Sequence, residues 1–347
     1  MRKALSASVL ASVVLLTLTA CDPPIPDSVL VEIAERSYNC EEGNVALAAP
    51  TLVTDVSYQW ADLVATGCES AMSIEPGAAV EGADIVIARE AYEPCSPFTT
   101  VPVAMDGAAV VFMNSEAFLL NLTAEAVQGI FSGTITNWSD PAIAEANPDL
   151  ILSDLPIEVS PASPQAAITA MENWTAQIAG TGTTFSLLQP DESEQQDSIF
   201  ELPEGGIALI ALSEALYSGM TLANVVDAEG NSVEPSLESL TFAATQFDFV
   251  KSETSVTANY DPEKEAIALA GQENAGAPYA AAFPLIMSLC GEDTLLKRAA
   301  GRFLVRQDSQ GLLGASTLGF LSEEVRIASA AVVAQGLPTP EAVSEAE

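Results

Sequence analysis

The 347-residue sequence contains no histidine at all. Without an imidazole, the chain can form no histidine metal site, no Ser-His or Cys-His catalytic pair and no histidine general base. Basic residues are also scarce, because 11 Lys and Arg stand against 48 Asp and Glu, which gives a formal net charge of -37. With so few cations, the protein has no basic face that could bind phosphate groups. The composition therefore excludes binding to nucleic acid or directly to an anionic membrane surface.

Aromatic residues are the third shortage, at 6% of the chain, although hydrophobic residues make up 49%. The hydrophobic fraction excludes an intrinsically disordered chain despite the large net charge. The core must therefore consist mostly of Ala, Val, Leu and Ile side chains. A chain of this length is long enough for two compact lobes, each with its own apolar interior.

The first twenty residues are typical of a secretion signal. Two basic residues precede an apolar run that is too short to span a membrane, and the run ends at Leu18-Thr19-Ala20-Cys21, which resembles a bacterial lipobox. We expect residues 1–20 to be a signal peptide, Cys21 to carry a lipid, and residues 21–43 to hold this cysteine and a tether. The alternatives are a plain signal peptide and an uncleaved anchor helix. The expected location is the cell envelope, on the outer face of the membrane or facing the periplasm, with the lipid as the only membrane contact.

The remaining cysteines favour structural disulfides. None of them forms a C-x-x-C pair, so metal or redox chemistry is not expected, and we predict neither a metal nor a cofactor. Four cysteines in an exported chain suggest two disulfides, for which three pairings are open. If both bonds form, at least one joins the N-terminal region to the C-terminal region. The four candidates are Cys40, Cys68, Cys95 and Cys290.

Strands and helices are expected to alternate along the chain, which predicts an α/β fold with layered sheets. Periodic apolar residues or N-cap signals predict helices, and short apolar or β-branched runs predict strands. The expected helices cover 52–65, 124–131 with Thr123 as N-cap, 165–178 and 294–305. The expected strands cover 71–74, 83–88, 101–112, 155–159, 205–211 and 240–250, and residues 44–49 form a short apolar run.

The segment Asn121–Trp138, which reads NLTAEAVQGIFSGTITNW, resembles a stretch of the phosphate-binding proteins of ABC importers. The similarity continues through Asp140-Pro141-Ala142-Ile143 and Asn147-Pro148, and weaker similarity covers Val103–Met113, Leu202–Ala208 and Leu295–Gly319. The resemblance implies a two-lobed, periplasmic-binding-protein-like (type II) α/β fold with two crossing hinge strands and a ligand in the cleft between the lobes. We interpret the Asn121–Trp138 stretch itself as scaffold, in which Gly133 permits a positive φ and Trp138 packs.

The same resemblance implies a division of the chain. Residues 44–104 together with 240–340 are expected to form lobe 1, and residues 105–239 are expected to form lobe 2. Closure would occur about a hinge near residues 101–106 and 240–250.

A phosphate cleft needs backbone N–H groups, hydroxyls and often an arginine. On the loops that correspond to those of the resembled family, the candidates are Thr51, Arg89, Glu90, Ser163 and Thr169. For Thr51, the two expected roles are a hydroxyl that binds the ligand and a helix N-cap. For Arg89 with Glu90, they are a contact to the ligand and an ordinary surface ion pair. The fourth loop, residues 162–169, keeps Ser163 but lacks the arginine, aspartate and Gly-Ser-Gly of the family.

These observations favour a surface-anchored, monomeric solute-binding lipoprotein that captures phosphate or a related oxyanion and delivers it to ABC permease subunits. The alternative is a non-transport envelope sensor or scaffold that kept the fold and lost the phosphate pocket. An enzyme is a third reading that would depend on a pair of carboxylates, and no pair stands apart from the surface acids. We therefore expect a binding protein and no enzyme.

Overall fold

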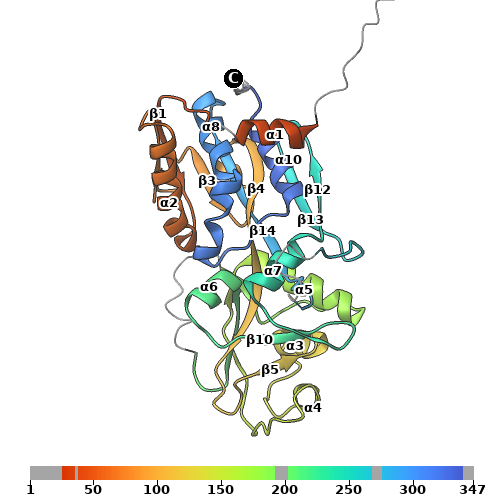
Figure 1. Ribbon diagram of the computed structural model, residues 1–347. Helices are drawn as coiled ribbons and strands as arrows, with labels where there is room; N and C mark the ends of the chain where they lie inside the picture. Colours follow the sequence, from red (N-terminus) through yellow and green to blue (C-terminus); the bar gives the residue numbers. More distant parts are fainter. Residues whose placement is uncertain (1–25, 36–37, 192–201, 268–275, 339–347) are drawn as a thin grey trace, which may run out of the picture.

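The computed structural model describes residues 26–35, 38–191, 202–267 and 276–338 (Figure 1). The predicted signal peptide and the lipidation site Cys21 lie outside these residues. In the part of the chain that is described, the helices are α1 (Asp27–Glu35), α2 (Thr51–Gly67), α3 (Ala124–Ser132), α4 (Pro141–Ala144), α5 (Gln165–Ala179), α6 (Leu212–Tyr217), α7 (Leu237–Ala244), α8 (Leu295–Leu304), α9 (Gln307–Gln310) and α10 (Glu323–Val333), with 3-10 turns at Glu93–Cys95 and Leu313–Ser316.

The strands of the same residues are β1 (Gly43–Ala48), β2 (Met72–Pro76), β3 (Ile85–Ala88), β4 (Pro97–Phe112), β5 (Leu120–Leu122), β6 (Glu158–Val159), β7 (Ala162–Ser163), β8 (Gln189–Pro190), β9 (Gly206–Ala211), β10 (Ala223–Val226), β11 (Ser232–Val233), β12 (Phe247–Lys251), β13 (Val256–Tyr260) and β14 (Ala282–Cys290).

A seven-stranded sheet with the order β2-β1-β3-β14-β4-β9-β6 runs through the molecule. Strand β4 is its central element, because it pairs with β14 as far as Gly107 and with β9 from Ala108 onwards. The elements α1 to β3 and β12 to α10 therefore lie at one end of β4, which we call the upper half, and β5 to β11 lie at the other, the lower half (Figure 1). The predicted lobe boundaries at residues 104 and 240 stay a prediction.

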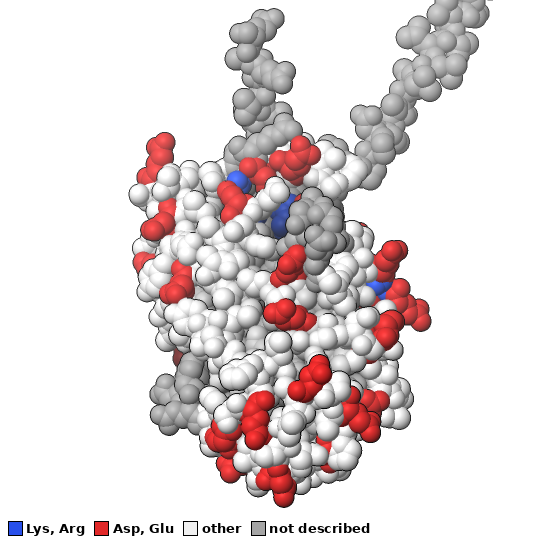
Figure 2. Space-filling model, turned by 60° about the horizontal axis from the view of Figure 1, so that its bottom comes forward, with Lys and Arg blue, Asp and Glu red and all other residues white. Residues whose placement is uncertain are grey.

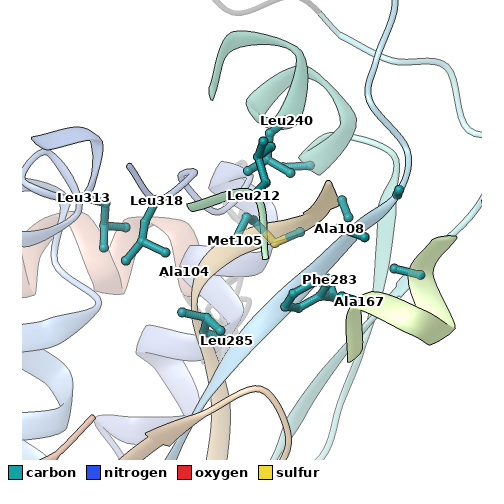
Figure 3. Packing of buried hydrophobic residues seen from close by; sticks show 14 of the residues in the cluster. Ala104, Met105, Ala108, Ala167, Leu212, Leu240, Phe283, Leu285, Leu313 and Leu318 are labelled. Atoms are coloured by element: carbon teal, nitrogen blue, oxygen red, sulfur yellow. The ribbon is translucent and has the colours of Figure 1, made fainter. Parts of the chain in front are cut away.

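Buried side chains from both halves meet around the middle of β4 (Figure 3). Met105 and Ala108 of β4 are buried together with Leu240 of α7 and Phe283 of β14. Gly319 approaches β4 closely at this point, since Met105 and Gly319 exchange two backbone hydrogen bonds of 2.9 and 2.8 Å. A Cβ at Gly319 would lie 2.9 Å from the Leu240 side chain, so only glycine fits there without a shift.

Most of the predicted elements are confirmed. The four expected helices correspond to α2, α3, α5 and α8, and Thr123 caps α3 by accepting a hydrogen bond from the Ala126 amide. Gly133 ends α3 with a φ of 82°, and the buried Trp138 donates its indole N–H to the Gly205 carbonyl at 3.0 Å, so both scaffold roles are confirmed. The strand expected over 155–159 is reduced to the two residues of β6.

The strand predicted over 240–250 is wrong in its first half. Residues up to Ala244 belong to α7, and only β12 from Phe247 onwards is extended. The helix forms because Ser236 and Ser239 make a capping box at its start, in which each side chain bonds the other residue's backbone amide. The chain therefore returns to the upper half through a helix at this point.

Two disulfides are present, Cys40–Cys68 and Cys95–Cys290. The second bond spans 195 positions and joins the N-terminal to the C-terminal region, which confirms that part of the cysteine prediction. Such bonds persist in oxidising compartments, in agreement with an exported chain.

Candidate ligand cleft

A cleft of about 830 Å³ opens between α5 and the upper half. One wall is a face of α5, and the other is formed by β12, β13 and β14, with Arg89 and Glu90 at the end of β3 between them. The volume falls within the range of roughly 300–1,000 Å³ that is common for sites of small organic ligands. The cleft-lining residues are Arg89, Glu90, Ala166, Thr169, Ala170, Asn173, Ala176, Gln177, Phe247, Ala258, Asn259, Tyr260, Ala282, Phe283, Pro284 and Ile286.

Helix α5 reaches the cleft because its two faces differ in polarity. Ala167, Met171 and Trp174 are buried on the inner face, and the Trp174 ring makes an edge contact with Tyr279 at 4.8 Å between centroids. The outer face carries small and uncharged polar residues toward the cleft. This arrangement places hydrogen-bonding side chains from the lower half opposite strands of the upper half.

Arg89 is the only cation among the described residues that line the cleft. Its Nη2 donates to the Glu214 carboxylate of α6 at 2.9 Å, and both side chains are nearly buried, at 11% and 10% exposure. Because Arg89 follows β3 in the upper half and Glu214 follows β9 in the lower half, this ion pair links the two halves. An anion entering the cleft must therefore compete with Glu214 for the guanidinium.

A buried carboxylate lies close to this pair. Asp106 of β4 accepts hydrogen bonds from the amides of Gly107 at 2.8 Å and Ser213 at 3.0 Å, and from the Ser213 hydroxyl at 2.7 Å. Burial raises the pKa of the Asp106 carboxyl above its ordinary value, although the hydrogen bonds from Ser213 and Gly107 and the charge of Arg89 act in the opposite direction. The folded state thus holds this proton more tightly than the unfolded chain.

This difference predicts the effect of Asp106→Asn on stability at different pH values. Asp106 has a pKa of 3.8 in the unfolded chain and a higher pKa in the folded protein. The stability that this difference contributes is fully present below pH 3.8 and is lost as the pH rises through the pKa of the folded state. The asparagine cannot titrate, so the stability of the variant relative to the natural protein should rise as the pH increases above 3.8. Urea unfolding at several pH values measures this difference. The control is Asp62→Asn on the exposed face of α2, and a difference that stays constant with pH would contradict the assignment.

The electrostatic character of the two halves differs strongly. The sequence contains no Lys or Arg between Arg89 and Lys251, a stretch that includes the whole lower half, whereas Asp and Glu recur throughout it. Figure 2 shows the lower end of the molecule covered with scattered acids, and the few basic side chains in this view lie on the upper half. Any contact that the lower half makes with an anionic ligand must therefore come from neutral donors.

Three of the five predicted site residues line this one cleft, namely Arg89, Glu90 and Thr169. Thr51 lies outside it, as the exposed first residue of α2, and the N-cap position belongs to Pro50 instead. Ser163 is also outside it, because its side chain is buried next to β8 and its hydroxyl bonds none of the described residues. The ligand roles of Thr51 and Ser163 therefore stay a prediction that this cleft does not support.

The sequence analysis missed several lining residues. Asn173 and Gln177 follow Thr169 at intervals of four, so the helical periodicity of the predicted 165–178 helix could have identified them. The ion-pair partner of Arg89, Glu214, could not be identified from the sequence in this way, because it lies 125 positions from Arg89.

Within the described ranges, no group of three or more Cys, Asp or Glu side chains could hold a metal ion. In the same ranges, no helix has the length and hydrophobicity needed to cross a bilayer.

Comparisons with known proteins show which family the chain resembles. Residues 78–279 match the family model described as PBP superfamily domain. The phosphate-binding protein PstS of Xylella fastidiosa, in strains Temecula1 and 9a5c, is 30% identical over 147 residues, which is 39% of this chain and 40% of the relative. The matched region thus spans less than half the length of these curated relatives.

A solved structure shares the fold. It is a high-affinity periplasmic phosphate-binding protein, PfluDING, bound with phosphate at pH 8.5. Its TM-score is 0.51 at 13% sequence identity, with 82% of this chain and 92% of that chain covered. This similarity confirms the predicted mixed α/β, periplasmic-binding-protein-like fold.

Proposed function

Because the chain belongs to the PBP superfamily, we propose that it is an exported solute-binding protein that captures phosphate or a related oxyanion in the cleft beside α5. The observation that carries the proposal is Arg89, the one cation among the described lining residues, at the point where both halves meet. Guanidinium groups bind oxyanions through several directed N–H donors. The neighbouring Glu90 can accept the proton of a monohydrogen anion, and Thr169 offers a hydroxyl from the lower half.

The proposed mechanism is closure of the two halves around the bound anion. A ligand that contacts both halves favours the closed state in proportion to its extra affinity for that state. The relatives named as phosphate-binding proteins support a binding role and no catalytic one. No cofactor takes part in this mechanism.

We place the protein on the outer face of the membrane, held by a lipid on Cys21, with ABC permease subunits as the partner that reads the closed state. Residues 21–43, which we predicted to hold the lipidated cysteine and a tether, include helix α1, and this helix packs at the upper end of the molecule, away from the lower half (Figure 1). Genes for permease and ATPase subunits next to the gene of this chain would support the transport role.

Calorimetric titration with phosphate tests the binding role. Arg89→Ala should weaken phosphate binding about 10- to 100-fold, because one charge-assisted hydrogen-bonding group is lost. Glu214→Gln should strengthen binding, since it removes the carboxylate that competes for the guanidinium. Lys297→Ala is the control, because Lys297 pairs with Asp84 at the opposite end of β3 and should leave the affinity unchanged.

The Arg89–Glu214 pair also favours one alternative function. A guanidinium neutralised by a protein carboxylate suits an envelope sensor or scaffold that kept the fold without an anion pocket. The absence of binding to phosphate, sulfate and other oxyanions, in the natural protein and in Glu214→Gln, would support this alternative and overturn the transport proposal.

A further inference from the structure

The cleft wall on α5 is a row of uncharged hydrogen-bonding side chains. Thr169, Asn173 and Gln177 stand four residues apart, are exposed and line the cleft. Residues at this spacing lie above one another on a helix face. The only charged residue of α5 is Glu172, whose carboxylate accepts the Phe185 amide at 2.7 Å outside this row.

The row is longer than an inorganic anion needs. Gln177 follows Thr169 by eight positions, which corresponds to about 12 Å along the helix axis at about 1.5 Å per residue. A phosphate ion held at Arg89 would contact one turn of α5 at most. Ala166, Ala170 and Ala176 beside the row keep the space in front of it open.

The chemistry of the row matches hydroxyl groups. An amide side chain offers both a donor and an acceptor, and a hydroxyl does the same, so each can satisfy the other. On the facing wall, Phe247 and Phe283 are apolar, Tyr260 is an aromatic ring with one hydroxyl, and Asn259 adds one more amide. Apolar surface with a few placed polar groups is typical of sites for small organic ligands.

The cleft and the cavity next to it differ in charge. Arg89 and Glu90 line the cleft but not that cavity, so an anionic group in the cleft can meet a guanidinium and donate its remaining proton to a carboxylate. Beyond Gln177 and Tyr260, an adjoining cavity of about 330 Å³ carries Asp227 and Glu229. The acids there repel a second anionic group, so the part of the ligand near Gln177 should carry no second negative charge.

We propose that the cleft binds a phosphate monoester of a sugar or polyol, with the phosphoryl group at Arg89 and the hydroxyls along Thr169, Asn173 and Gln177. The inference rests on the proposed function and names its ligand class. The phosphoryl end supplies the attraction to Arg89, and the α5 row supplies the preference for the hydroxylated body.

Calorimetry with glucose 6-phosphate, inorganic phosphate and glucose tests this proposal. We expect glucose 6-phosphate to bind at least tenfold more tightly than either of the others. The double variant Asn173→Ala/Gln177→Ala should lose about tenfold in affinity for glucose 6-phosphate and keep its affinity for inorganic phosphate. Both positions are exposed on a helix, where alanine is favoured, so the variant should fold. Gln59→Ala on the exposed face of α2 is the matched control.

The outcomes separate the two proposals. Phosphate binding without tighter binding of glucose 6-phosphate would overturn the monoester inference and leave the oxyanion function in place. Glucose binding as tightly as its phosphate ester would overturn the role of Arg89 as the anionic end. If neither phosphate nor glucose 6-phosphate binds, the proposed function itself fails.

Discussion

Replacing Glu35 by alanine is expected to lower the free energy of unfolding by about 3–5 kcal/mol, the usual cost of removing one partner from a buried ion pair. Glu35 is the last residue of α1, and its carboxylate accepts a hydrogen bond from Arg326 of α10. The same carboxylate lies 3.8 Å from the guanidinium of Arg302 on α8. The side chains of Arg302 and Arg326 are only 4% and 6% exposed, so water cannot replace the lost charge.

The geometry around Glu35 explains why the effect should be large. Arg302 has no other carboxylate within ion-pair distance among the described residues, and burial already lowers its pKa to about 10, partly offset by Glu35. The Glu35 backbone carbonyl also accepts from Arg306 at 3.0 Å. Loss of the carboxylate therefore leaves the buried Arg302 without an ion-pair partner among the described residues, although Arg326 keeps Glu323 and Arg306 keeps Asp308.

Equilibrium unfolding in urea measures this prediction. Asp62→Ala is a matched control, because it removes an acid from the exposed face of a helix and should change stability by less than about 0.5 kcal/mol. Glu35→Gln keeps the shape of the side chain and should still destabilise, since the charge is gone. A loss below about 1 kcal/mol for Glu35→Ala would show that α1 contributes little to the fold.

The helices could be predicted from the sequence because their signals are local. Gln165–Ala179 forms a helix from the spacing of its buried Ala, Met and Trp residues, and Thr123 caps α3 through a bond to a residue three positions away. The segment 240–250 misled the prediction because its aromatic and β-branched residues favour a strand. The capping serines that start α7 stand just before that segment, at Ser236 and Ser239.

The candidate site could be predicted only in part. Arg89, Glu90 and Thr169 were identified through the resembled family's loops, and all three line one cleft. Glu214 and Asn259 were not identified, because nothing in their local sequence indicates which distant residues they face. The same limit applies to Arg302 of α8, because its partner Glu35 lies on α1, far away in the sequence.

The Cys95–Cys290 disulfide is expected to contribute more stability than Cys40–Cys68. The two bonds close loops of 195 and 28 positions. The loop-closure model then gives roughly 5.3 kcal/mol for the long loop and roughly 3.6 kcal/mol for the short one. The long bond also joins the start of β4 to the end of β14, the two central strands of the upper half, where Pro97 pairs with Cys290. Its loss therefore frees the main sheet, while loss of the short bond frees a segment near α2.

Two double variants, Cys95→Ala/Cys290→Ala and Cys40→Ala/Cys68→Ala, allow a direct comparison in guanidinium unfolding, with each serving as control for the other. We expect the first to unfold at the lower denaturant concentration, by a margin of about 1.7 kcal/mol in the free energy of unfolding. Cys290 is buried against Ala48, Ala83 and Val86, so alanine keeps that contact apolar and limits any packing loss. Equal stability of the two variants, or the reverse order, would show that the loop-closure entropy of the long loop does not determine the free energy of unfolding.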